Sequence, residues 1–154
     1  MKNSYESPFS TRYASEEMQY LFSADKKFKT WRRLWVALAR AEMDQGLTNI
    51  TPDMVAELEA HVDDINYEVA EERERLVRHD VMSHVFAYGE QCPLAKPIIH
   101  LGATSCYVGD NADVIIMHEA LELICEKLVN VMAALSEFAL KYKDLPFCQV
   151  PYFF

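Results

Sequence analysis

Several features that would indicate a particular class of protein are scarce in this sequence. It has only four glycines in 154 residues, whereas alanine, leucine, glutamate and methionine are plentiful, so the composition favours helices. It has no excess of positive charge. The formal net charge is −9, which argues against nucleic acid as a general partner because phosphate binding needs a basic face. An anionic small ligand is still allowed, since a few clustered cations suffice locally.

Paired cysteines and long apolar runs are also missing. Cys92, Cys106, Cys125 and Cys148 form no CxxC pair and have no metal-ligand spacing, so we interpret them as reduced thiols. The N-terminal residues 1–6 contain no apolar signal core. No apolar run approaches the roughly 20 residues that span a bilayer. These absences predict a cytoplasmic protein that has no membrane segment.

Helix start signals recur along the first half of the chain. Ser15, Ser23, Thr51 and Asn66 stand where helix caps are expected, and proline follows Thr51 at the first helical position. Before Gly46, apolar residues at three- and four-residue steps form one stripe, made of Phe28, Trp31, Leu34, Trp35, Leu38 and Ala41. We therefore predict an all-α fold, with an extended arm over residues 1–14 and a loop region over residues 92–109.

The longest helical pattern runs from about Asp110 to Tyr142. Its apolar positions are Val114, Leu121, Ile124, Leu128, Val131, Leu135 and Phe138. A helix of about 30 residues spans about 45 Å, which is typical of elongated bundles. The remaining sequence offers only shorter helices. Other copies of the chain, or partner helices outside it, are therefore expected to cover this stripe.

Arg78, His79 and Asp80 form the first group that could carry chemistry. Arg78 suits a two-pronged contact with a phosphate or carboxylate, and His79 can exchange a proton near neutral pH. Asp80 could orient an imidazole or accept from a sugar hydroxyl. Consecutive helical residues point about 100° apart, so they face one point only if the helix ends or bends there. The alternative is a surface arginine beside a helix-end histidine and aspartate.

A second group lies in the stretch from His100 to Ser105. Small residues and the hydroxyls of Thr104 and Ser105 precede a helix start there, and such groups bind anionic oxygens well. The alternative is an ordinary capped loop. Arg12 and Tyr13, in the arm, add a cation and a phenol. His84 follows His79 by five residues rather than four, which argues against a helical zinc pair.

Taken together and in this order, these segments resemble the adenylosuccinate lyase family of the fumarase/aspartase superfamily. The resemblance covers residues from about 5 to 146. The segments that carry it are Ser10-Thr11-Arg12-Tyr13-Ala14-Ser15, Thr30-Trp31-Arg32-Arg33-Leu34-Trp35, Arg78-His79-Asp80-Val81-Met82-Ser83-His84 and Ile99-His100-Leu101-Gly102-Ala103-Thr104-Ser105-Cys106-Tyr107-Val108-Gly109-Asp110-Asn111.

The resemblance implies a reaction of purine and AMP biosynthesis. Such lyases remove fumarate from adenylosuccinate, leaving AMP, and from the succinyl-carboxamide intermediate of purine synthesis. A base takes a proton beside a carboxylate and an acid protonates the departing nitrogen. The resemblance implies a nucleotide substrate and no metal or organic cofactor. It also implies a homotetramer whose sites combine residues from several subunits around a bundle of long helices.

The resemblance also assigns roles to individual residues. Arg12 suits the nucleotide phosphate, and His79 is the catalytic candidate because it matches a position near the reacting centre that supports proton transfer. Thr104 and Ser105 match the hydroxyl pair that contacts the succinyl carboxylates. The full set of substrate-binding positions implied is Arg12, Tyr13, Arg78, His79, Asp80, Thr104 and Ser105.

The sequence departs from the family pattern after Pro146. The Thr-His pair whose histidine is the usual general acid is missing from residues 147–154, and the Met-Pro-x-Lys-x-Asn serine loop that supplies the general base is absent. We therefore expect an N-terminal portion of such an enzyme, inactive alone. Residues 1–109 are expected to form the N-terminal helical domain, residues 110–146 the first helix of the central bundle, and residues 147–154 a divergent tail.

Three other interpretations stay open. The chain could be another lyase of the superfamily, such as one acting on argininosuccinate. It could be a non-catalytic truncated isoform that binds full-length lyase subunits through its exposed stripe. The third interpretation is an acidic all-α domain without chemistry.

Overall fold

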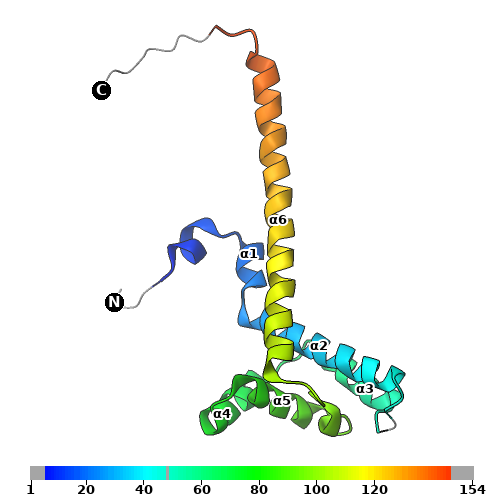
Figure 1. Cartoon of the computed structure of the whole chain (residues 1–154). Coiled ribbons are helices and arrows are strands. Elements are labelled where there is room, and N and C mark those ends of the chain that lie inside the picture. Colours follow the sequence, from blue (N-terminus) through cyan, green and yellow to red (C-terminus); the bar gives the residue numbers. More distant parts are fainter. Residues whose placement is uncertain (1–5, 48, 147–154) are drawn as a thin grey trace. The chain divides into compact units, whose positions relative to one another are not determined.

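The computed structural model of the chain describes residues 6–47 and 49–146 (Figure 1). In these ranges the regular secondary structure is entirely helical, which confirms the predicted all-α class. The chain divides into two units, residues 1–119 and residues 120–154. The predicted divergent tail, residues 147–154, lies outside the described residues.

The first unit contains short and medium helices, and the longest helix begins within it. In chain order the elements are a π-helical turn Phe9–Tyr13, α1 Glu16–Leu21, α2 Ala24–Asp44, α3 Pro52–Ala60, α4 Tyr67–Val77, α5 Asp80–Gln91, a 3₁₀ turn Lys96–Ile98 and α6 Ser105–Tyr142.

Four helices begin at the predicted caps. The side-chain oxygens of Ser15, Ser23, Thr51 and Asn66 each accept the backbone N–H found three residues later, at 3.2 to 3.4 Å. Each cap satisfies one of the N–H groups that have no partner at a helix start. Gly46, just beyond the end of α2, takes a φ of +87°. The helix therefore ends at Asp44, just before the glycine that follows the apolar stripe in the sequence.

Two expectations about the loops were wrong. The arm is not extended throughout, because the Ser7 carbonyl accepts the N–H groups of Ser10 and Thr11 at 3.1 and 3.2 Å and starts the π-helical turn. The loop region ends early, because α6 begins at Ser105 rather than near Asp110. Val108, which falls in this additional helical turn, is fully buried, so packing favours helix where the sequence pattern suggested loop.

The core of the first unit forms where α2, α3, α5 and the start of α6 supply large side chains. Trp31, Trp35, Leu58 and Tyr88 are each no more than 2% exposed. The Tyr88 hydroxyl donates to the Leu58 carbonyl at 2.6 Å, so this buried phenol is satisfied. The predicted stripe on α2 is confirmed at both tryptophans. Ala41 is exposed, and the stripe therefore ends sooner than predicted.

One core residue was not anticipated from the sequence. Arg32, on α2, is only 1% exposed. Its guanidinium donates to the His61 carbonyl and, at 2.6 Å, to Gln91 Oε1, and it lies 4.2 Å from the centre of the Tyr88 ring. Asp64 supplies a carboxylate at 3.5 Å. This one cation therefore joins α2 to the ends of α3 and α5.

His84 is a buried histidine of α5 that the fold keeps neutral. Its ring stacks on Phe28, with ring centres 3.7 Å apart, and Trp31 meets it edge-on. Burial, reinforced by the charges of Arg32 and Lys27 and opposed by Asp80, lowers the pKa of His84 to about 4. The ring is therefore uncharged in the folded chain at neutral pH.

Acidification is expected to destabilise the fold through His84. Its folded pKa of about 4 lies below its ordinary value of 6.5, so the unfolded chain binds the extra proton first. The stabilisation is complete above pH 6.5, and it is lost as the pH falls through 4. Denaturant unfolding between these limits should show a slope of about 1 kcal/mol per pH unit that His84→Phe removes. An identical pH dependence in the variant would contradict this interpretation.

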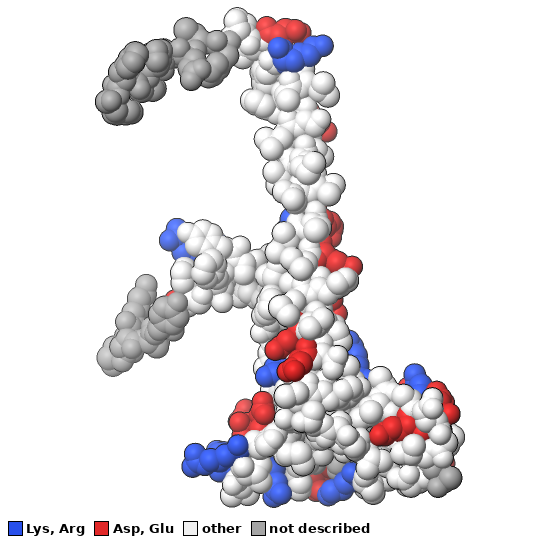
Figure 2. All heavy atoms as spheres, in the orientation of Figure 1, with Lys and Arg blue, Asp and Glu red and all other residues white. Residues whose placement is uncertain are grey.

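The second unit contains residues 120–142 of α6. Six apolar side chains of the predicted stripe are between 50% and 63% exposed, namely Leu121, Ile124, Leu128, Val131, Leu135 and Phe138. Figure 2 shows this part of the helix as a largely uncharged surface between its ends. Within the described ranges, no helix is long and apolar enough to cross a membrane.

Candidate functional site

The helical pattern breaks at Arg78, as it must for the charged triplet to act together. α4 ends at Val77, and Arg78 takes a left-handed conformation with φ 52° and ψ 44°. The Arg78 N–H closes the helix on the Glu74 carbonyl at 2.8 Å. Few residues other than glycine and asparagine adopt such a φ without strain. The backbone is therefore held in a strained shape at the first candidate residue.

His79 is the cap of α5, and this fixes the chemistry of its ring. Its Nδ1 accepts the Met82 N–H at 3.4 Å, so the neutral ring carries its proton on Nε2. Asp80 follows as the first residue of α5. Its Oδ1 accepts the Val81 N–H at 2.7 Å and lies 3.9 Å from His79 Nδ1. Both side chains are thus oriented by the backbone of one helix start.

An open groove of about 550 Å³ collects part of the predicted site. Arg78, His79 and Asp80 line it together with Ser105, the first residue of α6. The structure therefore brings two of the predicted segments to one place. The complete lining is Lys27, Trp31, Glu74, Arg78, His79, Asp80, Val81, Ser105, Cys106, Gly109, Asp110 and Asp113.

Three predicted site residues do not line this groove. Thr104 is exposed and directly precedes Ser105, without contributing to the lining. Arg12 and Tyr13 belong to the π-helical turn and are also exposed, with the guanidinium 5.4 Å from the centre of the tyrosine ring. Their role in binding a substrate stays a prediction.

Lys27 is a groove residue that the sequence interpretation missed. Its ammonium lies 4.9 Å from the centre of the Trp31 ring and 5.6 Å from that of Phe28, distances at which a cation is attracted to an aromatic face. The signal that could have identified Lys27 is its spacing from Trp31 in the sequence. A lysine four residues before Trp31 lies on the same face of a helix.

The charges in the groove do not favour an anion by themselves. Two permanent cations, Lys27 and Arg78, face a larger set of carboxylates, which is Glu74, Asp80, Asp110 and Asp113. A phosphate or dicarboxylate would therefore need further cations from outside this groove. The carboxylates suit hydroxyl donors, such as those of a sugar.

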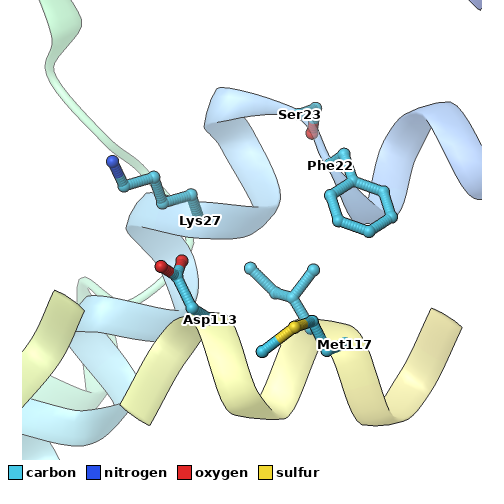
Figure 3. A pocket seen from close by; sticks show the side chains of 6 residues that line it. Phe22, Ser23, Lys27, Asp113 and Met117 are labelled. Carbon is cyan, nitrogen blue, oxygen red and sulfur yellow. The ribbon is translucent and has the colours of Figure 1, made fainter. Parts of the chain in front are cut away.

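A smaller pocket of about 330 Å³ shares two residues with the groove. Figure 3 shows Lys27 and Asp113 at one end and Phe22 and Met117 at the other. Ser23 and Ile116 complete its lining. The polar groove thus continues into a more apolar space between the start of α2 and α6.

His100 is a second imidazole close to the candidate site. The Trp35 indole Nε1–H donates to its Nδ1 at 3.0 Å, and its backbone takes a φ of +65°. Burial lowers the pKa of His100, and the nearby His79 lowers it further when its ring is protonated. The sequence interpretation included this residue in a motif but gave it no role.

No metal centre is found among the residues that the structure describes. In those ranges no three His, Cys, Asp or Glu side chains gather closely enough to hold a metal ion.

Comparison with known proteins identifies relatives of this sequence. It is 50% identical over 146 residues to adenylosuccinate lyase of Saccharomyces cerevisiae, covering 94% of this chain. It is 50% identical over 145 residues to adenylosuccinate lyase of Schizosaccharomyces pombe, covering 93% of this chain. It is 40% identical over 141 residues to adenylosuccinate lyase of Schistosoma mansoni, covering 92% of this chain. The match covers 30%, 30% and 29% of these relatives. The chain therefore spans about 30% of their length. No family model matches it.

Proposed function

Because this chain belongs to the adenylosuccinate lyase family, we propose that its groove is the part of a lyase active site that holds the substrate. The reaction proposed is β-elimination of fumarate from adenylosuccinate, giving AMP, and from the succinyl-carboxamide intermediate of purine biosynthesis. The proposed setting is the cytoplasm.

The observation that carries this proposal is the meeting of two distant segments. Arg78, His79 and Asp80, at the junction of α4 and α5, share one groove with Ser105 at the start of α6. A cation, an imidazole N–H and a hydroxyl can together orient a carboxylate-bearing substrate. The surplus of carboxylates in the groove supports a substrate that also carries hydroxyl groups.

Each side chain has a distinct proposed role. Arg78 binds a substrate carboxylate or phosphate, and Asp80 accepts from a hydroxyl. His79 supports proton transfer through Nε2, because its Nδ1 is occupied by the cap of α5. Ser105, with its neighbour Thr104, contacts the succinyl carboxylates.

The remaining parts of the proposed site come from outside the groove. Arg12 and Tyr13 would approach it to bind the nucleotide phosphate, which would supply the positive charge that the groove lacks. We propose that residues 1–109 form the N-terminal lyase domain, and that residues 110–146, which include most of α6, belong to a central bundle of long helices. In a homotetramer, other subunits would complete the site and provide the acid and the base.

A chimera tests the proposed function directly. Residues 6–146 replace the matching segment of the Saccharomyces cerevisiae relative, with which the chain is 50% identical. We expect this chimera to release fumarate from adenylosuccinate, whereas the 154-residue chain alone should not. A folded, assembled chimera without lyase activity would contradict the proposal.

A second function is favoured by the exposed stripe on residues 120–142. A chain that presents this stripe could bind full-length lyase subunits without catalysing the reaction. Mixing the chain with the Saccharomyces cerevisiae enzyme should then produce a mixed assembly and lower its activity. Leu128→Asp, which places a charge within the stripe, should prevent both effects.

A further inference from the structure

Trp31 and Trp35 are two buried tryptophans, about one helical turn apart on α2, and they differ in one respect. Trp31 is 2% exposed and Trp35 is 1% exposed. The indole Nε1 of Trp31 has no hydrogen-bond partner among the described residues. The indole Nε1–H of Trp35 donates to His100 Nδ1 at 3.0 Å. Of these two similar side chains, only Trp35 donates a hydrogen bond to an imidazole among the described residues.

The chemistry of this bond fixes the protonation of His100. An indole N–H is a donor and never an acceptor, so Nδ1 must present its lone pair to Trp35. The proton of the neutral imidazole then resides on Nε2. A second proton could be added only at Nδ1, and it would break the bond to the indole.

We propose that Trp35 is a positioning residue that holds His100 as the neutral Nε2–H tautomer, so that this imidazole offers a hydrogen-bond donor to an oxygen atom of a ligand. A phosphate, carboxylate or carbonyl oxygen fits such a donor. A metal ion does not fit it, because the Nε2 lone pair is absent in this form. The proposal concerns the state of His100 and does not depend on the lyase reaction.

The loop around His100 is built to keep this ring in place. The His100 carbonyl accepts the Ala103 N–H at 3.3 Å, and the Ile98 carbonyl accepts the Leu101 N–H at 3.2 Å. A left-handed φ of +65° at a non-glycine residue is a strained backbone that packing must stabilise. The backbone turn therefore holds the His100 imidazole in the position from which it accepts the hydrogen bond of Trp35.

Two titratable groups lie close to this turn. His79, from the start of α5, lowers the pKa of His100 when its own ring is protonated, after the larger effect of burial. Glu42, from α2, lies beside Gly102, and its Oε1 is 3.8 Å from the point that a Cβ atom would occupy on that glycine. Both groups must be followed in any titration of His100.

The test is an NMR titration of His100 in the 154-residue chain and in two matched variants. Trp35→Phe removes the donor, and Trp31→Phe removes an indole of similar burial whose Nε1 has no partner among the described residues. We expect His100 to titrate at a higher pH in Trp35→Phe, with Nδ1 becoming available for protonation. Its titration should stay unchanged in Trp31→Phe. Equal shifts in the two variants, or none in Trp35→Phe, would overturn the proposal.

A second pair of variants tests the same bond without disturbing the core. Asparagine tolerates a left-handed φ, and its side-chain oxygen can replace Nδ1 as the acceptor. In His100→Asn the indole N–H of Trp35 should keep its slow exchange with solvent, whereas His100→Ala should accelerate that exchange. The indole N–H of Trp31 should be the same in both. Equal exchange of the Trp35 indole in the two variants would count against the bond.

Discussion

Replacing Arg32 with alanine is expected to lower the free energy of unfolding by about 3–5 kcal/mol. The guanidinium is buried, donates to the His61 carbonyl and to Gln91, and lies over the Tyr88 ring. Its removal leaves partly buried acceptors without their donor and opens a cavity between α2, α3 and α5. Denaturant unfolding of the chain, followed by circular dichroism, measures the loss.

The adjacent arginine provides the control for this prediction. Arg33 has a side chain that is 57% exposed, and it meets Asp63 at 3.5 Å. Arg33→Ala should change the stability by less than about 1 kcal/mol, because exposed ion pairs contribute little. Similar losses in both variants would mean that the buried contacts of Arg32 do not stabilise the fold in the way described.

Arg78→Ala in the active chimera is expected to reduce kcat/KM by about 100- to 1,000-fold. Arg78 is one of two permanent cations that line the groove, so its loss leaves the carboxylates there almost unopposed. Steady-state kinetics with adenylosuccinate measures the effect. Arg75→Ala, in the last turn of α4 and outside the groove lining, should keep normal kinetics.

Arg78→Gly separates the side chain from the backbone. Glycine adopts the left-handed φ of 52° without strain, so this variant should be at least as stable as Arg78→Ala. Its kcat/KM should nevertheless fall as far. Recovery of activity in Arg78→Gly would show that the backbone shape at the end of α4, and not the guanidinium, is what the site requires.

Local signals in the sequence were sufficient to predict most helix starts. A cap depends on a side chain and an N–H three residues later, as at Ser23 and Asn66, and such a pattern can be read directly. The burial of Arg32 could not be predicted, because its partners His61 and Gln91 lie 29 and 59 residues away. The start of α6 was misplaced for a related reason, since it depends on the packing of Val108.

The candidate site was predicted in part. The triplet Arg78-His79-Asp80 and Ser105 were identified from residue type and motif, and the structure places them in one groove. Lys27 and the contact between Trp35 and His100 were missed, because both depend on how α2 packs against later segments. A motif can indicate which side chains carry chemistry, but the residues that orient them are set by the tertiary fold.

The location of the two tryptophans makes intrinsic tryptophan fluorescence a probe of the first unit alone. Both belong to the first unit and are buried, and the sequence contains no other tryptophan. Emission from their indoles should therefore shift to the red when the first unit unfolds, and it should be insensitive to melting of residues 120–142. Far-ultraviolet circular dichroism, which follows helix content, records both units. A difference between the two signals on heating would reveal separate transitions.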